Sequence, residues 1–248
     1  MRSKIPGLLS APGLCLTLAA ALLAAGGAKC QQVPVTARVQ VVSKGQSKPA
    51  AGGGDADVVV WLKALDVPAR GLEPATKHQK LVQSHKTFEP HLLVVQVGSV
   101  VDFPNRDPFF HNVFSLFEGK RFDLGLYEAG ATNSVRFDRV GVSFLFCNIH
   151  PEMSAVVVSV DTPYFGVSDA SGKVNIANVP DGRYEVHYWS ERGLPESLKR
   201  STRTVAITNS DRSLALVEIA ENPTFTTEHK NKYGQDYTPP PSTSYPRP

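Results

Sequence analysis

The segment Cys147-Asn148-Ile149-His150-Pro151-Glu152-Met153 is the most informative part of this sequence. It places a thiol, an imidazole and a thioether at intervals of three residues, and Met153 is the only methionine after Met1. An apolar run at 142–146 precedes the stretch and another at 155–160 follows it. Their β-branched and aromatic side chains predict two strands joined by this loop. Three side chains that can bind a soft metal therefore share one predicted connection between strands.

A second imidazole, His111, lies 36 residues upstream and follows a predicted strand at 100–103. Two imidazoles, a thiolate and a weak axial thioether form the ligand set of a mononuclear blue-copper centre, whereas a thioether is a poor zinc ligand. The alternative is a buried free cysteine, a hydrogen-bonded histidine and a core methionine that merely share this spacing. The order of these four residues at predicted strand ends favours one copper ion, cycling between Cu(I) and Cu(II), held by His111, Cys147, His150 and Met153.

Over residues 86–160 the sequence resembles the cupredoxins, most closely the amicyanin, pseudoazurin and plastocyanin types. The shared features are Phe88-Glu89-Pro90, Gly98 between two short predicted strands, Asn105, His111-Asn112 and Cys147-x2-His150-x2-Met153. The resemblance implies a Greek-key sandwich with these four ligands. It also implies that Asn112 supports the site without binding the metal, by tying the two ligand loops together. A redox protein partner is then expected to dock near His150, whose ring edge passes electrons in this family.

A second β module is predicted from two turns, Asp169-Ala170-Ser171-Gly172 and Pro180-Asp181-Gly182, each followed by a predicted strand. This rhythm resembles the carboxypeptidase regulatory-like domain, a small transthyretin-type β-sandwich. Two earlier predicted strands, at 35–41 and 58–62, resemble the missing first half of that domain. We therefore predict a sandwich made from both ends, with the cupredoxin inserted. The alternative assigns 58–62 to the cupredoxin's own sheet.

The predicted fold class is all-β: a Greek-key cupredoxin sandwich plus a second small β-sandwich. The expected divisions are a signal peptide at 1–30, the first strands of the regulatory-like sandwich at 33–66, the cupredoxin at 80–161, the rest of the regulatory-like sandwich at 163–221, and a disordered Pro-rich tail at 222–248. The tail lacks apolar periodicity, so it is not expected to bury enough surface to become ordered.

The N-terminus has the pattern of a cleavable secretory signal. Arg2 and Lys4 precede an apolar run at 14–25, and small residues follow at 24–28. Lys29 argues against lipoprotein processing at Cys30. We expect export to the periplasm or the extracellular space. A lone cysteine at 147 in an oxidising compartment then calls for a metal or a reactive role.

The balance of charges bears on the expected partners. The chain has 26 basic and 23 acidic residues, but three basic residues lie in the leader, which leaves 23 of each sign beyond it. Net charge near zero gives no support for a nucleic-acid partner or strong membrane binding. The histidines at 78, 85 and 91 are expected on the polar surface rather than in a second metal site.

No Ser-His-Asp order, phosphate-binding loop or paired-carboxylate pattern is present, so we expect no enzyme activity. The leading hypothesis is an exported blue-copper one-electron carrier. One alternative is a periplasmic copper-handling protein that delivers or stores the ion, and another is a non-catalytic surface β-sandwich module.

Overall fold

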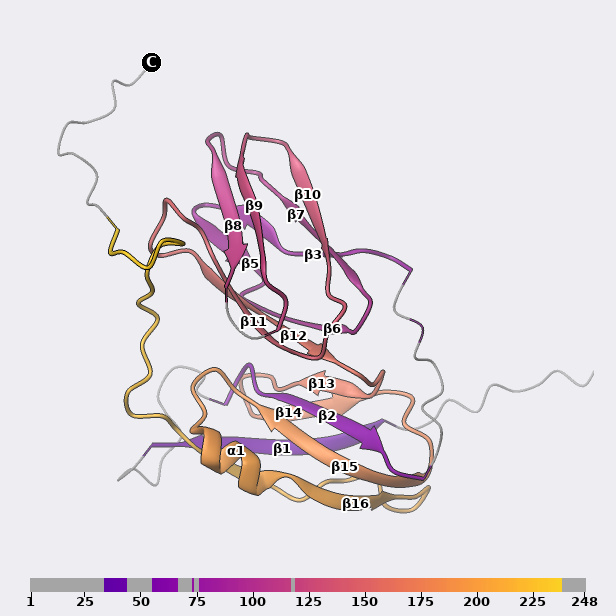
Figure 1. The fold of residues 1–248 in the computed structure, drawn as a ribbon. Helices are drawn as coiled ribbons and strands as arrows, with labels where there is room; N and C mark the ends of the chain where they lie inside the picture. Colours follow the sequence, from indigo (N-terminus) through magenta and orange to yellow (C-terminus); the bar gives the residue numbers. More distant parts are fainter. Residues whose placement is uncertain (1–33, 44–54, 67–72, 74–75, 117–118, 238–248) are drawn as a thin grey trace, which may run out of the picture. The chain divides into compact units, whose positions relative to one another are not determined.

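The computed structural model describes residues 34–43, 55–66, 73, 76–116 and 119–237 (Figure 1). These residues form 17 strands and one short helix, so the all-β prediction is confirmed. The predicted signal peptide and the Pro-rich end from 238 onward lie outside the described residues. In the described part of the chain, no helix has the length and apolar character needed to cross a membrane.

The middle of the chain forms a sandwich that carries the predicted ligands. A five-stranded sheet has the order β6 (Leu92–Gln96), β12 (Ser154–Val160), β11 (Gly141–Phe146), β8 (His111–Ser115) and β9 (Phe122–Tyr127). A three-stranded sheet has the order β10 (Thr132–Arg136), β7 (Val100–Pro104) and β3 (Gln79–Lys80). A small hairpin joins β4 (Val82–Ser84) to β5 (Thr87–Glu89). We refer to these elements as the ligand-bearing sandwich.

The alternation of side chains along each strand explains which residues form the core of the ligand-bearing sandwich. In β11 and the residue after it, Leu145 and Cys147 belong to the buried core, whereas Phe144 and Phe146 are not part of that cluster. Successive side chains of a strand point to opposite faces, which explains this division. The turn between β6 and β7 uses Gly98 at φ 93°, a left-handed conformation that glycine adopts without steric cost.

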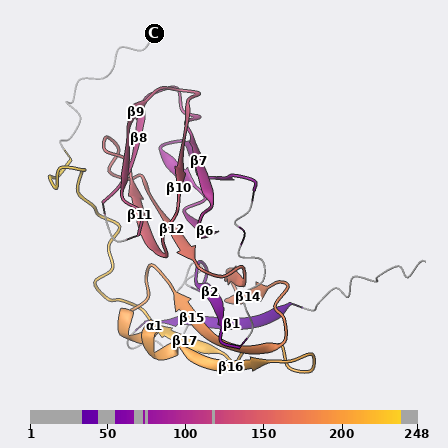
Figure 2. The ribbon, with the colours of Figure 1, turned by 45° about the vertical axis from the view of Figure 1, so that its right-hand side comes forward.

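Strands that precede and strands that follow the ligand-bearing sandwich in the sequence together form a second sandwich. One sheet has the order β14 (Lys173–Ile176), β1 (Val35–Val42) and β17 (Val217–Ala220). The other has the order β13 (Phe165–Val167), β2 (Val59–Ala64), β15 (Gly182–Trp189) and β16 (Arg203–Ile207). The short helix α1 (Pro195–Ser201) connects β15 to β16. Both views of the ribbon show β1 and β2 among strands from the later part of the chain (Figures 1 and 2).

Strand pairing distinguishes the two arrangements considered for residues 58–62. β2 pairs with β15, with Leu62 opposite Val186, and β1 pairs with β14, with Val35 opposite Ile176. This pairing is the one that the inserted arrangement requires. The domain boundaries and the regulatory-like family of the second sandwich stay predictions.

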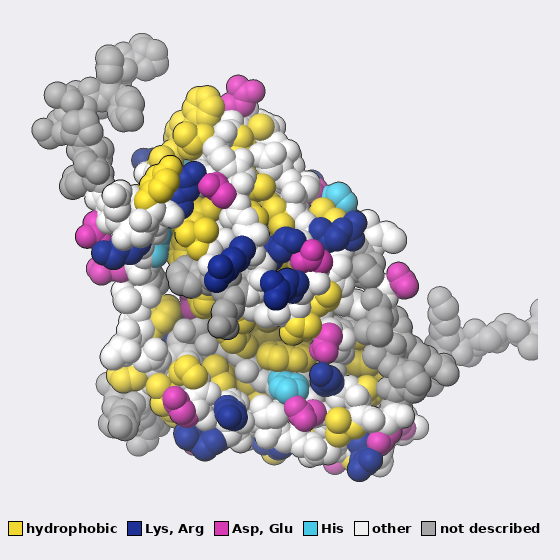
Figure 3. Space-filling view, in the orientation of Figure 1, with side chains coloured by type: hydrophobic (Ala, Val, Ile, Leu, Met, Phe, Trp, Pro, Cys, Tyr) yellow, Lys and Arg dark blue, Asp and Glu magenta, His cyan; other side chains and the backbone are white. Residues whose placement is uncertain are grey.

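The surface is mixed in charge on the face that Figure 3 shows. Basic and acidic side chains are interspersed across it, without a broad area of one sign. This distribution is in keeping with the balanced charge of the sequence beyond its leader.

The structure differs from the sequence prediction at residues 222–237. This segment was expected to be disordered, but it has a described path and hydrogen bonds to the ligand-bearing sandwich. The physical reason is tertiary: its histidine and tyrosine side chains find partners on that sandwich, which the composition of the segment does not reveal.

Candidate metal centre

The loop between β11 and β12 carries three of the predicted ligands. The two strands pair up to Phe146 and Ser154, so residues 147–153 close the end of this hairpin. The Met153 amide donates to the His150 carbonyl at 3.1 Å, and the Cys147 amide donates to the Met153 carbonyl at 3.2 Å. These two bonds fold the loop back on itself and bring His150 and Met153 beside Cys147.

His111 comes from the neighbouring strand. It is the first residue of β8, which pairs with β11, and its side chain is fully buried. Its Nε2 lies 2.8 Å from Oδ2 of Asp107. Asp107 also accepts hydrogen bonds from the amides of His85 and Lys86, at 2.7 and 2.9 Å. A histidine whose one nitrogen faces a carboxylate presents the other nitrogen, here Nδ1, to a metal.

Asp107 is a site residue that the sequence did not reveal. Burial works against its charge, but the Lys86 amide, His111 and the His85 amide hold the pKa of this carboxyl below its ordinary value. The available signal was the acidic residue four positions before a predicted ligand histidine. Its contact with the ring could not be inferred from spacing alone.

The donor atoms of His111, Cys147 and His150 converge. The two Nδ1 atoms are 3.1 Å apart, and the Cys147 sulfur lies 3.8 Å from His111 Nδ1 and 3.6 Å from His150 Nδ1. Nitrogen and sulfur atoms that bind one ion at about 2.0–2.3 Å must lie within about 4.4 Å of each other. All three separations satisfy this limit. Within the described ranges, this is the only group of three or more His, Cys, Asp and Glu side chains placed to hold a metal.

Met153 is the fourth predicted ligand. It is fully buried and belongs to the same apolar core as Cys147. Together His111, Cys147, His150 and Met153 form a cluster typical of a type 1 copper site, in which the thioether is the weak axial ligand. The role of Met153 as that axial ligand stays a prediction.

Burial controls the protonation of the donors. It raises the pKa of the Cys147 thiol, against the opposing effect of hydrogen bonds from the amides of Asn112, Ile149 and His150. Burial, and then the neighbouring His111, lower the pKa of His150. The uncharged forms of both groups are therefore favoured. A metal cation would supply the positive charge that a buried thiolate needs.

Asn112 supports the site through its backbone. Its amide is one of the donors to the Cys147 sulfur. Its side-chain nitrogen instead donates to β9, at 2.7 Å to Oδ1 of Asp123 and 2.9 Å to the carbonyl of Gly125. Within the described residues, its side-chain oxygen has no hydrogen-bond partner. The main-chain contact links β8 to the start of the ligand loop, and the role of Asn112 in tying the two ligand loops together stays a prediction.

The loop histidine lies at the surface beside aromatic side chains. His150 is half-buried, and its ring centroid is 5.6 Å from that of Phe109. Phe110 and Ile149 are 55% and 43% exposed. The Lys86 ammonium sits 5.7 Å above the Phe109 ring. We name Phe109, Phe110 and Ile149 the apolar rim of the site.

The three other histidines considered as a second metal site lie apart. His78 contacts Asp102, His85 contacts Ser84, and His91 contacts Glu191. Within the part of the chain that the structure describes, they form no metal-binding group.

Comparisons with known proteins gave structural similarities only. No family model matches the sequence, and no curated protein matches it. A purple cupredoxin from Nitrosopumilus maritimus is 22% identical over 33% of this chain and 99% of its own, with a TM-score of 0.30. An amicyanin variant in its Cu(I) form is 20% identical over 41% of this chain and 98% of its own, with a TM-score of 0.32. A copper-containing nitrite reductase from Thermus scotoductus is 21% identical over 48% of this chain and 28% of its own, with a TM-score of 0.33. Similarities of this size do not assign the chain to a family.

Proposed function

We propose that the protein is a cupredoxin-type copper protein that carries single electrons. The observation that carries this proposal is the convergence of His111 Nδ1, His150 Nδ1 and Cys147 Sγ within 3.1–3.8 Å of one another at one end of a β-sandwich. Copper bound by such a donor set supplies a one-electron couple, because three strong ligands with a weak axial thioether suit both oxidation states.

The residues around the donors favour a site that changes little when an electron enters or leaves. His111 is held by Asp107, which is itself held by two backbone amides. The loop from 147 to 153 is closed by two main-chain hydrogen bonds. His111, Cys147 and Met153 are fully buried, so water has little access to their donor atoms. Supporting contacts of this kind fix the orientation of metal ligands and tune the metal.

We propose that a redox protein partner docks on the apolar rim next to His150. The exposed Phe110 and Ile149 offer apolar surface beside the half-buried imidazole. A partner with a complementary apolar face would exclude water there and approach the ring edge of His150, a proposed ligand that is itself half-buried. Export from the cytoplasm belongs to the same proposal and rests on the leader sequence.

The test is reversible cycling of the purified, copper-loaded protein. Spectroelectrochemistry should give a one-electron wave whose oxidised and reduced spectra are recovered over repeated cycles. Phe110→Ser should slow electron exchange with a physiological or inorganic partner and leave the visible spectrum unchanged, because the rim does not bind the metal. Release of copper on each reduction would contradict an electron carrier.

Copper delivery is the second candidate, and the partial exposure of His150 favours it. A surface ligand gives an incoming partner access to the ion. Delivery predicts rapid transfer of Cu(I) to a competing chelator and slow transfer of electrons. Electron carriage predicts the reverse.

A further inference from the structure

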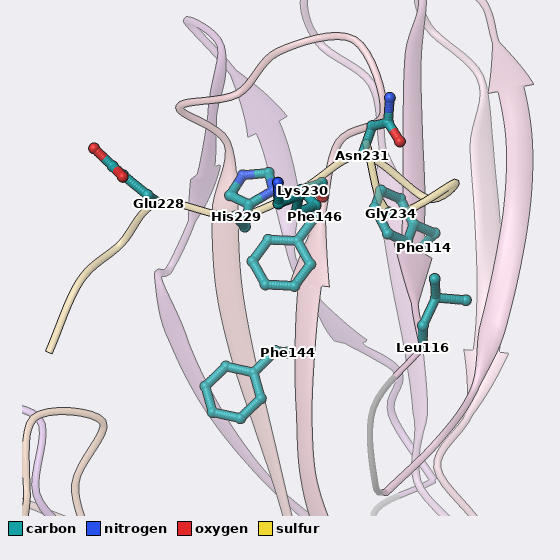
Figure 4. A pocket seen from close by; sticks show the side chains of 9 residues that line it. All are labelled: Phe114, Leu116, Phe144, Phe146, Glu228, His229, Lys230, Asn231 and Gly234. Atoms are coloured by element: carbon teal, nitrogen blue, oxygen red, sulfur yellow. Dashed lines mark hydrogen bonds between the residues drawn. The ribbon is translucent and has the colours of Figure 1, made fainter. Parts of the chain in front are cut away.

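The C-terminal segment covers the outer face of the ligand-bearing sheet. We name residues 228–237 the strap. It crosses the aromatic side chains of β8 and β11, and Figure 4 shows the His229 ring beside Phe146. A cavity of about 480 Å³ lies between the strap and the apolar side chains of Phe114, Leu116, Phe144 and Phe146. The strap thus lies against residues that directly precede the ligand loop.

One strap residue bonds to the main chain of the ligand cysteine. The Tyr237 hydroxyl donates to the Cys147 carbonyl at 2.6 Å. The Tyr237 oxygen lies 3.2 Å from His229 Nδ1. Because the single hydroxyl proton goes to the carbonyl, the His229 nitrogen must be the donor in this second contact. The His229 ring in turn stacks on Phe146, with centroids 4.1 Å apart and planes at 27°.

A second strap residue reaches both elements that carry ligands. The Lys232 amide donates to Oδ1 of Asn148, the residue after Cys147, at 3.0 Å. Its ammonium lies 2.8 Å from Oδ2 of Asp123, whose other oxygen accepts from the Asn112 side chain at 2.7 Å. The strap is therefore bonded to the β11–β12 loop directly and to β8 through Asp123.

The contacts of the strap fall on Cys147 and on the residues directly before and after it. Phe146 is stacked, the Cys147 carbonyl accepts a hydrogen bond, and the Asn148 side chain accepts another. Three consecutive positions are thus held from outside the sheet. The direction of the Cys147 main chain sets where its sulfur can point, so a contact to the carbonyl acts on the metal site without touching the metal.

We propose that the strap is a component of the metal centre and that Tyr237 is its principal positioning residue. The proposal rests on the copper site of the proposed function. Tyr237 fixes the Cys147 carbonyl, His229 orients the Tyr237 hydroxyl, and Lys232 holds the neighbouring Asn148. The ligand geometry of this cupredoxin-type loop is then set partly by a segment 90 residues further along the chain.

The experiment compares Tyr237→Phe with Tyr233→Phe in the full-length protein. Tyr233 lies in the same strap but is 70% exposed and contacts Lys232 rather than the ligand loop. Each substitution removes one hydroxyl and keeps the ring. Cu(I) affinity is measured by competition with a chromophoric chelator. Amide hydrogen exchange of residues 147–153 is measured in the metal-free protein, and the visible and EPR spectra are recorded after Cu(II) is added.

Tyr237→Phe should weaken Cu(I) binding by about tenfold, the lower end of the effect of removing a group that supports metal ligands. Exchange in the metal-free loop should be about fivefold faster, as expected for one lost hydrogen bond. Tyr233→Phe should stay within about twofold of the unmodified protein in both measurements. Lys232→Met should fall between the two, because its backbone bond to Asn148 is retained.

Equal behaviour of Tyr237→Phe and Tyr233→Phe in affinity and exchange would overturn the role of the strap. If the unmodified protein binds Cu(I) but cannot cycle between oxidation states, the electron-carrier proposal fails, and the affinity and exchange data still decide for or against the strap. If it binds no copper, the strap has no role in a metal centre and this inference fails as well.

Discussion

Both sandwiches have cores of mainly apolar strand residues, yet within the described residues only one of them brings metal-binding side chains together. The core of the second sandwich consists of aliphatic side chains and tyrosines, and its buried Tyr184 hydroxyl is satisfied by the Pro180 carbonyl at 2.8 Å. The core of the ligand-bearing sandwich includes Cys147 and Met153, and His111 is buried beside them. The difference lies at the strand ends, which lead into hydrogen-bonded turns in the second sandwich and carry donor side chains in the ligand-bearing one.

This comparison separates fold from function. Alternating apolar residues explain both cores equally well. The chemistry depends on a few side chains at the ends of β11 and β8, held by loops on a rigid scaffold. Substitutions in each sandwich can test how far the two are independent in stability and in their effect on the metal.

The largest effect on the copper spectrum is expected from Cys147→Ser. This substitution leaves the end of β11 without a sulfur ligand, as in the core of the second sandwich. A hydroxyl cannot replace a soft thiolate in its bond to copper, so the thiolate charge-transfer band should be lost completely. Visible spectra at equal protein and Cu(II) concentrations provide the measurement. A band of undiminished intensity in this variant would show that another group binds the metal.

A matched pair of core truncations tests whether the sandwiches are independent. Leu62 in β2 and Leu145 in β11 are both fully buried, and replacing either by alanine should lower the free energy of unfolding by about 2–5 kcal/mol. Urea denaturation measures both losses. Only Leu145→Ala should change the copper spectrum of the folded protein, because Leu145 lies two residues before Cys147 in the same core. A changed spectrum in folded Leu62→Ala would show that the core of the second sandwich also affects the metal site.

A smaller effect is expected from Met153→Leu. The two side chains have similar volumes, so stability should fall by less than about 1.5 kcal/mol. Loss of a donor disfavours Cu(II) more than Cu(I), so the reduction potential should rise, by about 59 mV for each tenfold change in the ratio of the two affinities. Voltammetry of the copper-loaded variant measures the shift. An unchanged potential would remove Met153 from the ligand set.

The smallest effect concerns the ion pair between Lys232 and Asp123. Although burial opposes it, hydrogen bonds from Lys232, Asn112 and the Gly125 amide hold the pKa of Asp123 below its ordinary value, and Lys232 is the charged group that faces it. A carboxyl whose pKa is lowered by folding contributes stability above its unfolded pKa of about 3.9, and this is lost as pH falls through the folded pKa.

Lys232→Met should therefore cost less than about 1 kcal/mol at pH 7, since the pair is partly exposed to solvent. The cost should disappear at a pH below the lowered pKa of Asp123. Chemical denaturation of both proteins at several pH values gives the comparison. A difference that persists unchanged in acid would mean that the lysine acts through packing instead.

The sequence predicted what is local and missed what depends on tertiary packing. His150 and Met153 follow Cys147 in a short loop, so their proximity could be inferred from spacing. The contact of Asp107 with His111 depends on the path of the turn before β8, and that of Tyr237 with Cys147 joins residues 90 positions apart. Composition indicated disorder from residue 222 onward. It could not reveal that His229 stacks on an aromatic side chain of the ligand-bearing sandwich, because composition contains no information about tertiary contacts.

The pairing of β1 and β2 with later strands could be anticipated from local sequence signals. The turns at Asp169–Gly172 and Pro180–Gly182 are local signals, and the family that they resemble begins with two strands that precede such turns. The main-chain contact of Asn112 with the Cys147 sulfur could not be distinguished from a side-chain contact by sequence, since both use the same residue.

We expect Cys147, His111 and His150 to bind one copper ion through the thiolate and two imidazoles. The most direct measurement is the addition of one equivalent of Cu(II) to the purified protein, followed by visible and EPR spectroscopy. We expect an intense thiolate-to-copper charge-transfer band toward the red end of the spectrum, together with a narrow copper hyperfine splitting. A spectrum with only weak absorption, the same as that of Cys147→Ser, would contradict this claim.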